Sequence, residues 1–459
     1  MAGIGFELKK ILNRNRLFSI MEVYGYSAVL SSGPWIISII TILFIGLIKT
    51  HDSGNVYEII QFQISITYLL GLSLIFSGFF QISFSRYVAD LIYRNEKEKI
   101  IPSFLGILFI LFVTGFIFIL LFSYVFLKNI SSLYVIFFIG SFISLLGIWV
   151  SNSLLLGIKE YKKILFIYLF SYFLIFILSF TLGNYGFEWL MGSFFIGNSV
   201  LFFLLSYVIV HNYQFNKLID FDFININGKG LILSLGFSGF FYNLGIWADK
   251  IIFWFSKDTG YNVIGGLKAS VIYDLPLFLS YLSTIPGMAI FFYRLEADFA
   301  EKYDYFYTAV RDGLTLKDIT DAKIEMIDSI RIMIREIIII QGIFDMIIYS
   351  YSMSIFEVLN IPKLYIPLFH IDLIGVQLQL GLMAMLSVLF YLNKRFYALF
   401  ISILFTLLNF LLSYITIKHL GVAFFGYGFA LSAFVSFIVS LFIIRNVMED
   451  LEYETFMLV

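Results

Sequence analysis

Long apolar runs without charged residues recur along almost the whole chain, and they restrict its fold more than any motif does. A helix needs roughly 20 apolar residues to cross a hydrocarbon core of about 30 Å. Twelve stretches reach this length, at approximately 26–48, 59–83, 101–126, 133–156, 164–183, 188–210, 230–256, 270–293, 331–352, 367–392, 396–417 and 424–444. Because the runs are long and do not alternate, they predict an all-α polytopic membrane protein rather than a β-barrel.

Composition supports a protein that lives in lipid. Hydrophobic residues make up 60% of the chain and charged residues 13%, whereas soluble domains are about 45–50% apolar. The chain has no cysteine, which excludes disulfides, thiolate nucleophiles and cysteine-held metal sites.

The distribution of positive charge predicts the orientation of the chain. If the N-terminus is cytoplasmic, 23 of the 30 Lys and Arg residues fall on the inner side of the twelve spans and 7 on the outer side. Lys and Arg are enriched in cytoplasmic loops of membrane proteins. We therefore expect a multi-pass protein of the cytoplasmic (inner) membrane with both termini in the cytoplasm.

The spans divide evenly along the chain. We expect an N-terminal six-helix bundle over 26–210, a cytoplasmic linker over 211–229, and a C-terminal six-helix bundle over 230–459. Two bundles of even helix count enter the membrane from the same side, as parallel repeats do. Within residues 1–25, Ile4, Leu8, Ile11 and Leu12 fall on one helical face. This indicates an interfacial amphipathic helix or a basic leader that sets topology.

A charged segment interrupts the second bundle. Residues 294–330 predict a cytoplasmic helical extension that breaks at Gly313 and continues in a helix opened by Thr315 or Thr320. Two interpretations remain open, a solvated helical hairpin or a docking surface for a cytoplasmic partner.

Ionisable residues inside the predicted spans gather in the C-terminal half. Asp249 and Lys250 lie in one span, Asp274 opens the next, Asp345 is deep in another, and His370 and Asp372 follow near the end of a fourth. Charges at membrane depth cost several kcal/mol on translocon-based scales, so such groups face one another or a wet cavity. The C-terminal half therefore predicts a polar path.

Helical geometry separates the adjacent acid and base. Neighbouring helix residues point about 100° apart, so Asp249 and Lys250 are expected to serve different partners, with Lys250 also able to reach the headgroups. Asp345 is either a coupling residue that carries a proton or cation, or a hydrogen-bonded acid that holds two helices together.

Prolines interrupt the spans at three notable positions. Pro34 follows Ser-Ser-Gly in the first span, and Pro276 and Pro286 lie ten residues apart in the eighth. A proline removes a backbone donor and frees a carbonyl inside a helix. Pro34, Pro276 and Pro286 are hinge candidates, although structural kinks without function are also common.

Several kinds of chemistry are not indicated. No phosphate-binding loop is present, the four histidines are scattered without metal-ligand spacing, and the outer loops are short. We expect no catalytic residues, no metal, no cofactor and no nucleic-acid partner, so the chain does not read as an enzyme.

Three local sequences and the twelve-span plan resemble a known family. The start MAGIGFELKKIL, the element WADK at 247–250 and the element YDLP at 273–276 are similar to the PelG-type subunit of Pel exopolysaccharide export systems, in the multidrug/oligosaccharidyl-lipid/polysaccharide (MOP) exporter superfamily. The resemblance implies two six-helix bundles around a central cavity and export of a galactosamine-containing polysaccharide. It implies a cytoplasmic glycosyltransferase and other membrane subunits of the Pel machinery as partners.

Sugar polymers need a hydrogen-bonding route through the bilayer, and aromatic faces beside polar groups can hold sugars loosely. The substrate-path candidates are Tyr242, Asn243, Trp247, Asp249, Lys250, Tyr273 and Asp274. Alternative functions are an ion-coupled antiporter, a lipid-linked oligosaccharide flippase of the same fold, and a scaffold subunit of a polysaccharide synthase. Alternating access and a conduit driven by synthesis both remain open as mechanisms.

Overall fold

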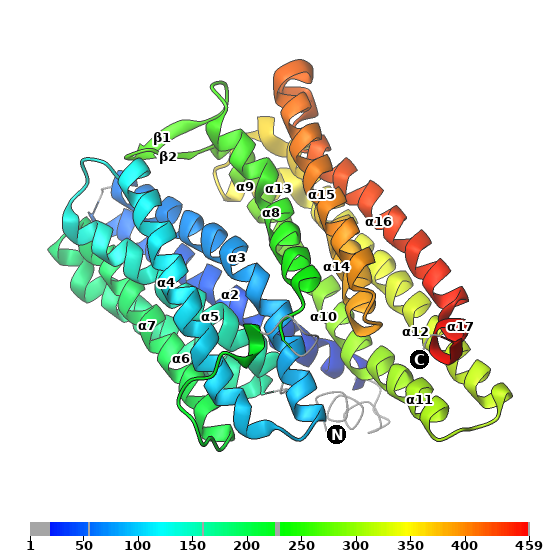
Figure 1. The fold of residues 1–459 in the computed structure, drawn as a ribbon. Helices are drawn as coiled ribbons and strands as arrows, with labels where there is room; N and C mark the ends of the chain where they lie inside the picture. The colour runs from blue at the N-terminus through cyan, green and yellow to red at the C-terminus, as the bar shows by residue number, and fades with distance from the viewer. Residues whose placement is uncertain (1–18, 54–55, 158–159, 225–229, 458–459) are drawn as a thin grey trace. The chain divides into compact units, whose positions relative to one another are not determined.

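The computed structural model describes residues 19–53, 56–157, 160–224 and 230–457, and these residues are almost entirely helical (Figure 1). The α-helices are α2 Ser19–Ser53, α3 Val56–Tyr93, α4 Ile100–Phe126, α5 Ser132–Gly157, α6 Tyr161–Thr181, α7 Phe187–Asn212, α8 Leu233–Phe255, α9 Val271–Ser283, α10 Ile285–Tyr293, α11 Ala300–Arg311, α12 Leu316–Glu336, α13 Gly342–Val358, α14 Ile366–Tyr391, α15 Arg395–Ile415, α16 Tyr427–Glu449 and α17 Leu451–Met457. The expected interfacial helix lies outside the described residues up to residue 18, and residues 19–25 belong to α2.

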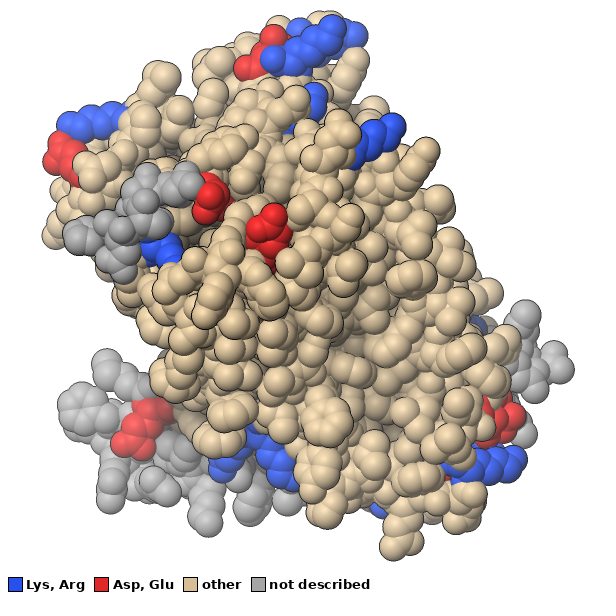
Figure 2. Space-filling model, turned by 90° about the vertical axis from the view of Figure 1, so that its left-hand side faces the viewer, with Lys and Arg blue, Asp and Glu red and all other residues tan. Residues whose placement is uncertain are grey.

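Helices cover all twelve predicted stretches, so the all-α membrane fold is confirmed. Among the described residues, nine helices are long and apolar enough to cross a membrane, or ten if the bent pair α9 and α10–α11 forms one span. The predicted stretches at 230–256 and 331–352 carry more polar and charged residues, so the count of twelve spans stays a prediction. Figure 2 shows one face on which Lys, Arg, Asp and Glu gather toward two ends, with a broad uncharged band between them.

The chain forms two compact units. Over the described residues, unit 1 lies within Met1–Gly33, Ala248–Ile252 and Val271–Val459, and unit 2 within Pro34–Trp247 and Phe253–Ser270. This division differs from the predicted boundary at 211–229. The first turns of α2 belong to unit 1, whereas most of α8 and residues 256–270 belong to unit 2.

In unit 2, α5 packs against α3, α4 and α7, and α6 packs against α7 (Figure 1). Helices α3 and α8 approach closely at a pair of glycines: a Cβ added at Gly239 would lie 2.3 Å from the carbonyl oxygen of Gly78. Small residues allow such backbone contact between membrane helices. This contact is one of those that hold most of α8 in unit 2, although α8 follows the predicted linker.

In unit 1, α14 packs against α9, α13 and α16, and α15 packs against α16. Helices α11 and α12 form the helical pair expected over 294–330 (Figure 1). Gly313 has φ +67° between them, and the Thr315 hydroxyl caps α12 by accepting from the Asp318 amide at 3.3 Å. Thr315, rather than Thr320, therefore opens the second helix.

Asparagine ends several of the helices. Four asparagines with φ between 54° and 63° follow the last turns of α3, α4, α13 and α14, namely Asn95, Asn129, Asn360 and Asn393. Asparagine tolerates the left-handed conformation at the residue after a helix better than most residues do. These positions keep the connections between the helices short.

A small β-hairpin connects α8 to α9. Strands β1 (Tyr261–Ile264) and β2 (Leu267–Ala269) pair antiparallel around Gly265, which has φ +57°. The hairpin is held to unit 2, because the Gly266 amide donates to the carbonyl of Phe126 at 2.6 Å and the Tyr57 hydroxyl donates to that of Val263 at 2.8 Å.

Candidate functional site

A buried polar cluster in unit 1 surrounds Asp249, which is fully buried. The Tyr273 hydroxyl donates to Asp249 Oδ2 at 2.6 Å, and the Asn409 amide donates to Asp249 Oδ1 at 3.3 Å. The Ser413 hydroxyl in turn donates to the Asn409 carbonyl oxygen at 3.0 Å. Helices α8, α9 and α15 therefore each contribute to one hydrogen-bonded group. Tyr273, a predicted path residue, joins it from α9.

Lys250 lies beside this group, and its side chain is only 11% exposed. Its ammonium is 3.6 Å from Asp249 Oδ1 and lies over the rings of Tyr281 and Phe429, at 5.2 Å and 5.9 Å from their centroids. The prediction that Asp249 and Lys250 do not pair was therefore wrong. The four-carbon lysine stem is long and flexible enough to bring the ammonium near the neighbouring carboxylate, and the 100° separation of the Cβ directions does not prevent this.

Asp372 of α14 completes the cluster. Its side chain is fully buried, and neither carboxyl oxygen has a hydrogen-bond partner among the described residues. Gly426, with φ +85°, leaves room beside it, since a Cβ there would lie 2.8 Å from Asp372 Oδ1. The charge of Asp372 interacts with those of Asp249 and Lys250.

These three charges do not balance. Asp249, Lys250 and Asp372 carry a formal charge of −1 together when all are ionised. A buried carboxylate without compensation costs several kcal/mol. The arrangement can therefore take up one proton or one monovalent cation, and the proton or cation would go to Asp372, the acid without a hydrogen-bond donor.

Asp345 lies in a separate buried group. It accepts from the Gln341 amide at 2.8 Å and from the Ser283 hydroxyl at 3.0 Å. Gln341 also donates to the Ser283 carbonyl at 2.9 Å and accepts from the Gly287 amide at 2.9 Å. These contacts favour the second interpretation of Asp345, an acid that holds two helices together.

The same contacts surround Pro286. The pair α9 and α10–α11 is bent by 43° at the break between Ser283 and Ile285, and Pro286 stands in the first turn of α10. Gln341 supplies hydrogen bonds to the backbone at this break. In contrast, α2 continues through Pro34 and α9 continues through Pro276. Of the three hinge candidates, Pro286 is therefore the one at a helix break.

The remaining path candidates lie mostly in helix packing. The Asn243 amide donates to the Leu74 carbonyl at 3.0 Å, and the Trp247 ring covers Gly71 in unit 2. Tyr242 is partly buried in α8, and Asp274 is partly buried in the first turn of α9. Asn243 and Trp247 thus hold α8 to α3, which the sequence alone could not distinguish from lining a path.

A row of neutral polar groups in unit 2 follows one side of α3. The Trp149 ring nitrogen donates to Ser73 Oγ at 2.9 Å, and the Gln81 amide donates to Ser77 Oγ at 2.8 Å. Ser153 of α5 donates to the Gln81 carbonyl at 3.1 Å and shares a 2.6 Å hydrogen bond with Ser85. We call Ser73, Ser77, Gln81, Ser85, Trp149 and Ser153 the neutral row.

Family and structural comparisons place these features in a known context. The model of the PelG family, described as "Putative exopolysaccharide Exporter (EPS-E)", matches residues 1–456. The chain belongs to the PelG family. A comparison with curated protein sequences finds no match.

Solved structures similar to this PelG-family chain are MOP-superfamily transporters. An outward-facing multidrug resistance MATE family transporter is 14% identical, with a TM-score of 0.62 over 93% of this chain and 96% of that one. A MOP superfamily transporter from Pyrococcus furiosus gives the same values. A MATE structure in the bent conformation is 13% identical, with a TM-score of 0.62 over 94% and 96%. At such identities the similarity shows the MATE-like fold alone.

Sequence reasoning missed part of the candidate site. Asp372 was not among the path candidates, although an acid in the apolar run FHIDLIG is a signal that could have found it. Asn409 and the neutral row were not singled out, because serine, asparagine and glutamine are common in helix interfaces. Among the described residues, no group of three or more His, Cys, Asp and Glu side chains is placed to hold a metal ion.

Proposed function

We propose that this chain carries a galactosamine-containing exopolysaccharide across the cytoplasmic membrane, with both its termini in the cytoplasm. The observation that carries the proposal is the match to an exopolysaccharide exporter family over residues 1–456. The MATE-like fold and the neutral row agree with it. In the neutral row, Ser73 and Ser77 are buried, and the partly exposed members are Gln81, Ser85, Trp149 and Ser153. Partly exposed hydroxyl, amide and indole groups suit a polyhydroxylated chain that must be held weakly and released.

Export is coupled, in this proposal, to a proton or a monovalent cation bound at Asp372. A ligand shifts a conformational equilibrium only when it binds the two states with different affinity. The uncompensated charge at Asp372 supplies such a difference if the cluster rearranges between states. A buried charge that can bind an ion is needed for coupled transport but not for a purely structural role in a synthase, so it supports the first of these functions.

Secreted polymer from host cells that lack the chain tests the export proposal. Complementation with the wild type restores polymer outside the cells, and sugar analysis of that polymer tests for galactosamine. Undiminished secretion without the chain would reject the export function. Polymer without galactosamine would reject the substrate assignment alone.

The coupling proposal has its own variants. We expect Asp372→Asn to reduce secretion by about tenfold or more at equal membrane abundance, because the exchangeable charge is removed. Asp328→Asn is the matched control, since Asp328 is an exposed acid on α12. Secretion that survives both Asp372→Asn and Asp249→Asn would reject coupling at this cluster.

We further propose that the tip of the pair α11–α12, around Leu314 and Leu316, docks the cytoplasmic glycosyltransferase of the Pel machinery. Apolar side chains are exposed around its tip: Leu316 is 70% exposed and Leu314 43% exposed. Exposed apolar residues on an otherwise charged surface are typical of interaction sites. Leu314→Ser with Leu316→Ser should reduce co-purification of the glycosyltransferase from solubilised membranes, whereas Lys317→Ser should not. Equal recovery with all variants would reject this surface.

A further inference from the structure

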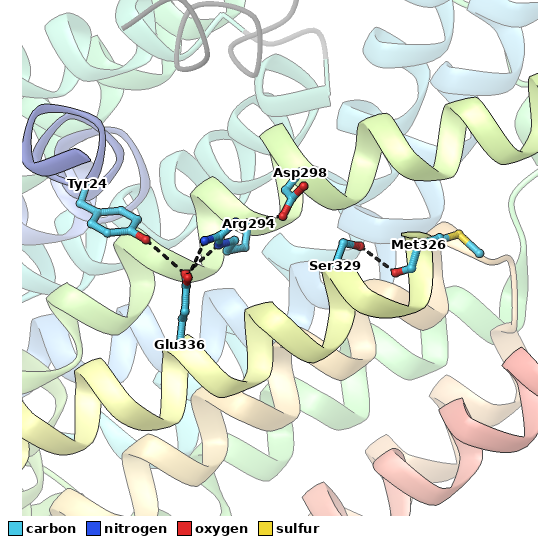
Figure 3. A network of polar contacts seen from close by, with 6 residues as sticks. All are labelled: Tyr24, Arg294, Asp298, Met326, Ser329 and Glu336. Carbon is cyan, nitrogen blue, oxygen red and sulfur yellow. Dashed lines mark hydrogen bonds and ion pairs between the residues drawn. The ribbon is translucent and has the colours of Figure 1, made fainter. Parts of the chain in front are cut away.

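A second network in unit 1 joins three helices outside the buried acid cluster (Figure 3). The Arg294 guanidinium contacts Glu336 through two nitrogens, with Nε to Oε2 at 2.6 Å, and donates to Asp298 at 2.9 Å. The Tyr24 hydroxyl donates to Glu336 Oε2 at 3.1 Å. The Tyr24 ring also packs edge-on against Tyr293, with centroids 5.6 Å apart. We call Tyr24, Arg294 and Glu336 the latch.

Both partners of this ion pair border a π-helical turn. Arg294 begins the turn Arg294–Phe299, which joins α10 to α11. Glu336 directly precedes the turn Ile337–Gln341, which joins α12 to α13. The second turn has the sequence IIIIQ, and no proline or glycine within it forces the helix to widen. π-helical turns are rare and often mark functional positions, so the cause lies in the contacts of the turn.

Those contacts explain why the second turn is π-helical. Glu336 and Gln341 contact the same continuous helical segment, Glu336 at Arg294 and Gln341 at Gly287. Five residues of α-helix would point these two side chains about 140° apart. A π turn, which bonds residue i to i+5, brings them to one face. Arg294 and Gly287 are seven residues apart, which is about two α-helical turns, and already share a face.

We infer that Arg294 and Glu336 are positioning residues of the transport cycle, and that the turn Ile337–Gln341 is a two-state element. While both contacts are made, the turn is π-helical and the latch is closed. When the turn becomes α-helical, Glu336 rotates by about 100° relative to Gln341, its contact with Arg294 breaks, and Tyr24 is released. This inference rests on the proposed export function.

The position of Tyr24 indicates what the latch controls. Tyr24 lies in the first turns of α2, which belong to unit 1, and α2 belongs to unit 2 from Pro34 onward. The closed latch therefore fixes one end of a helix that both units share. Opening it frees that end while the Gln341 contacts still hold the break at Pro286.

The absence of cysteine makes a direct test practical. Arg294→Cys with Glu336→Cys places two thiols across the latch, and a short reducible bis-thiol cross-linker then closes it covalently. We expect cross-linking in whole cells to reduce polymer secretion by about tenfold or more, and reductant to restore it, because gating motions limit turnover. Lys302→Cys with Glu325→Cys, across the exposed ion pair of α11 and α12, should cross-link without this loss.

Efficient cross-linking at the latch with unchanged secretion would overturn the inference while leaving the export proposal intact. A failure of the export proposal is recognised separately, because secretion would then persist in cells that lack the chain. Loss of secretion with the control pair alone would also overturn the inference.

Hydrogen exchange tests the coupling to α2 in the purified chain, without any transport assay. Glu336→Gln keeps the size of the side chain but removes the charge that Arg294 binds. We expect backbone amide exchange in residues 22–30 to rise by about tenfold, because the end of α2 loses its anchor. Glu325→Gln, in the exposed pair with Lys302, is the control and should change nothing there. Equal exchange in both variants would overturn the inference even if Arg294→Cys with Glu336→Cys failed to fold.

Discussion

The interiors of the two units contain different kinds of polar groups: carboxylates in unit 1 and mainly neutral groups in unit 2. The buried carboxylates of the described residues, Asp249, Asp345 and Asp372, all lie in unit 1. In unit 2, the buried charged residue among those described is Lys49, whose ammonium donates to Asn184 at 2.7 Å. The rest of the polar interior of unit 2 is hydroxyl, amide and indole.

This difference separates two tasks that an exporter needs. Neutral groups bind sugar hydroxyls weakly and do not respond to a voltage or an ion gradient, whereas a buried acid does respond. Under the proposed function, we therefore expect unit 2 to contact polymer and unit 1 to respond to ions. Variants of single residues in each unit test this difference.

The largest effect on stability is expected at Asp249. Asp249→Asn removes the carboxylate that lies 3.6 Å from the Lys250 ammonium and accepts from Tyr273. Breaking a buried ion pair from one side costs about 3 kcal/mol. Asp372→Asn should instead leave the melting temperature unchanged or raise it, since Asp372 has no hydrogen bond to lose among the described residues. Thermal melts in detergent, followed by helical circular dichroism, measure both. Equal destabilisation by the two variants would contradict the charge imbalance.

In unit 2 the largest effect is expected from packing. Gly239→Ala places a Cβ 2.3 Å from the Gly78 carbonyl oxygen, a backbone atom that cannot move alone. Overpacking of this kind costs about 1–3 kcal/mol. Gly157→Ala is the control, because a Cβ there meets nothing within 4 Å. A Gly239→Ala melting temperature equal to that of Gly157→Ala would show that the α3–α8 contact is not needed for stability.

The fold was predictable because it depends on long apolar runs, and those survive errors of a few residues at each end. The break at Gly313 and the cap at Thr315 were also predictable, since both follow from local backbone chemistry. The boundary between the units was not. It depends on the Gly78–Gly239 contact between residues far apart in the chain.

The candidate site was predictable only in part, for a related reason. Asp249, Lys250 and Tyr273 were all path candidates and lie together, although Asp249 and Lys250 were expected to serve different partners. Asn243 and Trp247 share a helical face with Lys250 but pack on α3. The sequence shows which residues share a helical face, but it does not show which other helix packs against that face. Asp372 and Asn409 belong to the site because α14 and α15 pack near Asp249. No local sequence pattern shows that these helices lie close to α8.

A smaller effect is expected in the neutral row. Trp149→Phe keeps an aromatic ring but removes the donor to Ser73 Oγ, which should cost about 1 kcal/mol of stability. Trp35→Phe is the control, because Trp35 is exposed at 37% and should change stability by less than about 0.5 kcal/mol. If the neutral row contacts polymer, Trp149→Phe should also lower secretion more than its stability loss explains. Secretion that tracks membrane abundance in both variants would contradict this role.

The smallest effect is expected at an exposed ion pair of unit 1. The hydrogen bond from Lys363 lowers the pKa of Glu357, at the end of α13, below its ordinary value. Stability from this pair is therefore fully present above the ordinary glutamate pKa of about 4.3 and disappears as the pH falls through the lowered pKa. Both side chains are more than half exposed, so solvent screens them and Lys363→Ala should shift the melting temperature at pH 7 only slightly. A shift as large as that of Asp249→Asn would show that charge alone, and not its burial, distinguishes unit 1 from unit 2.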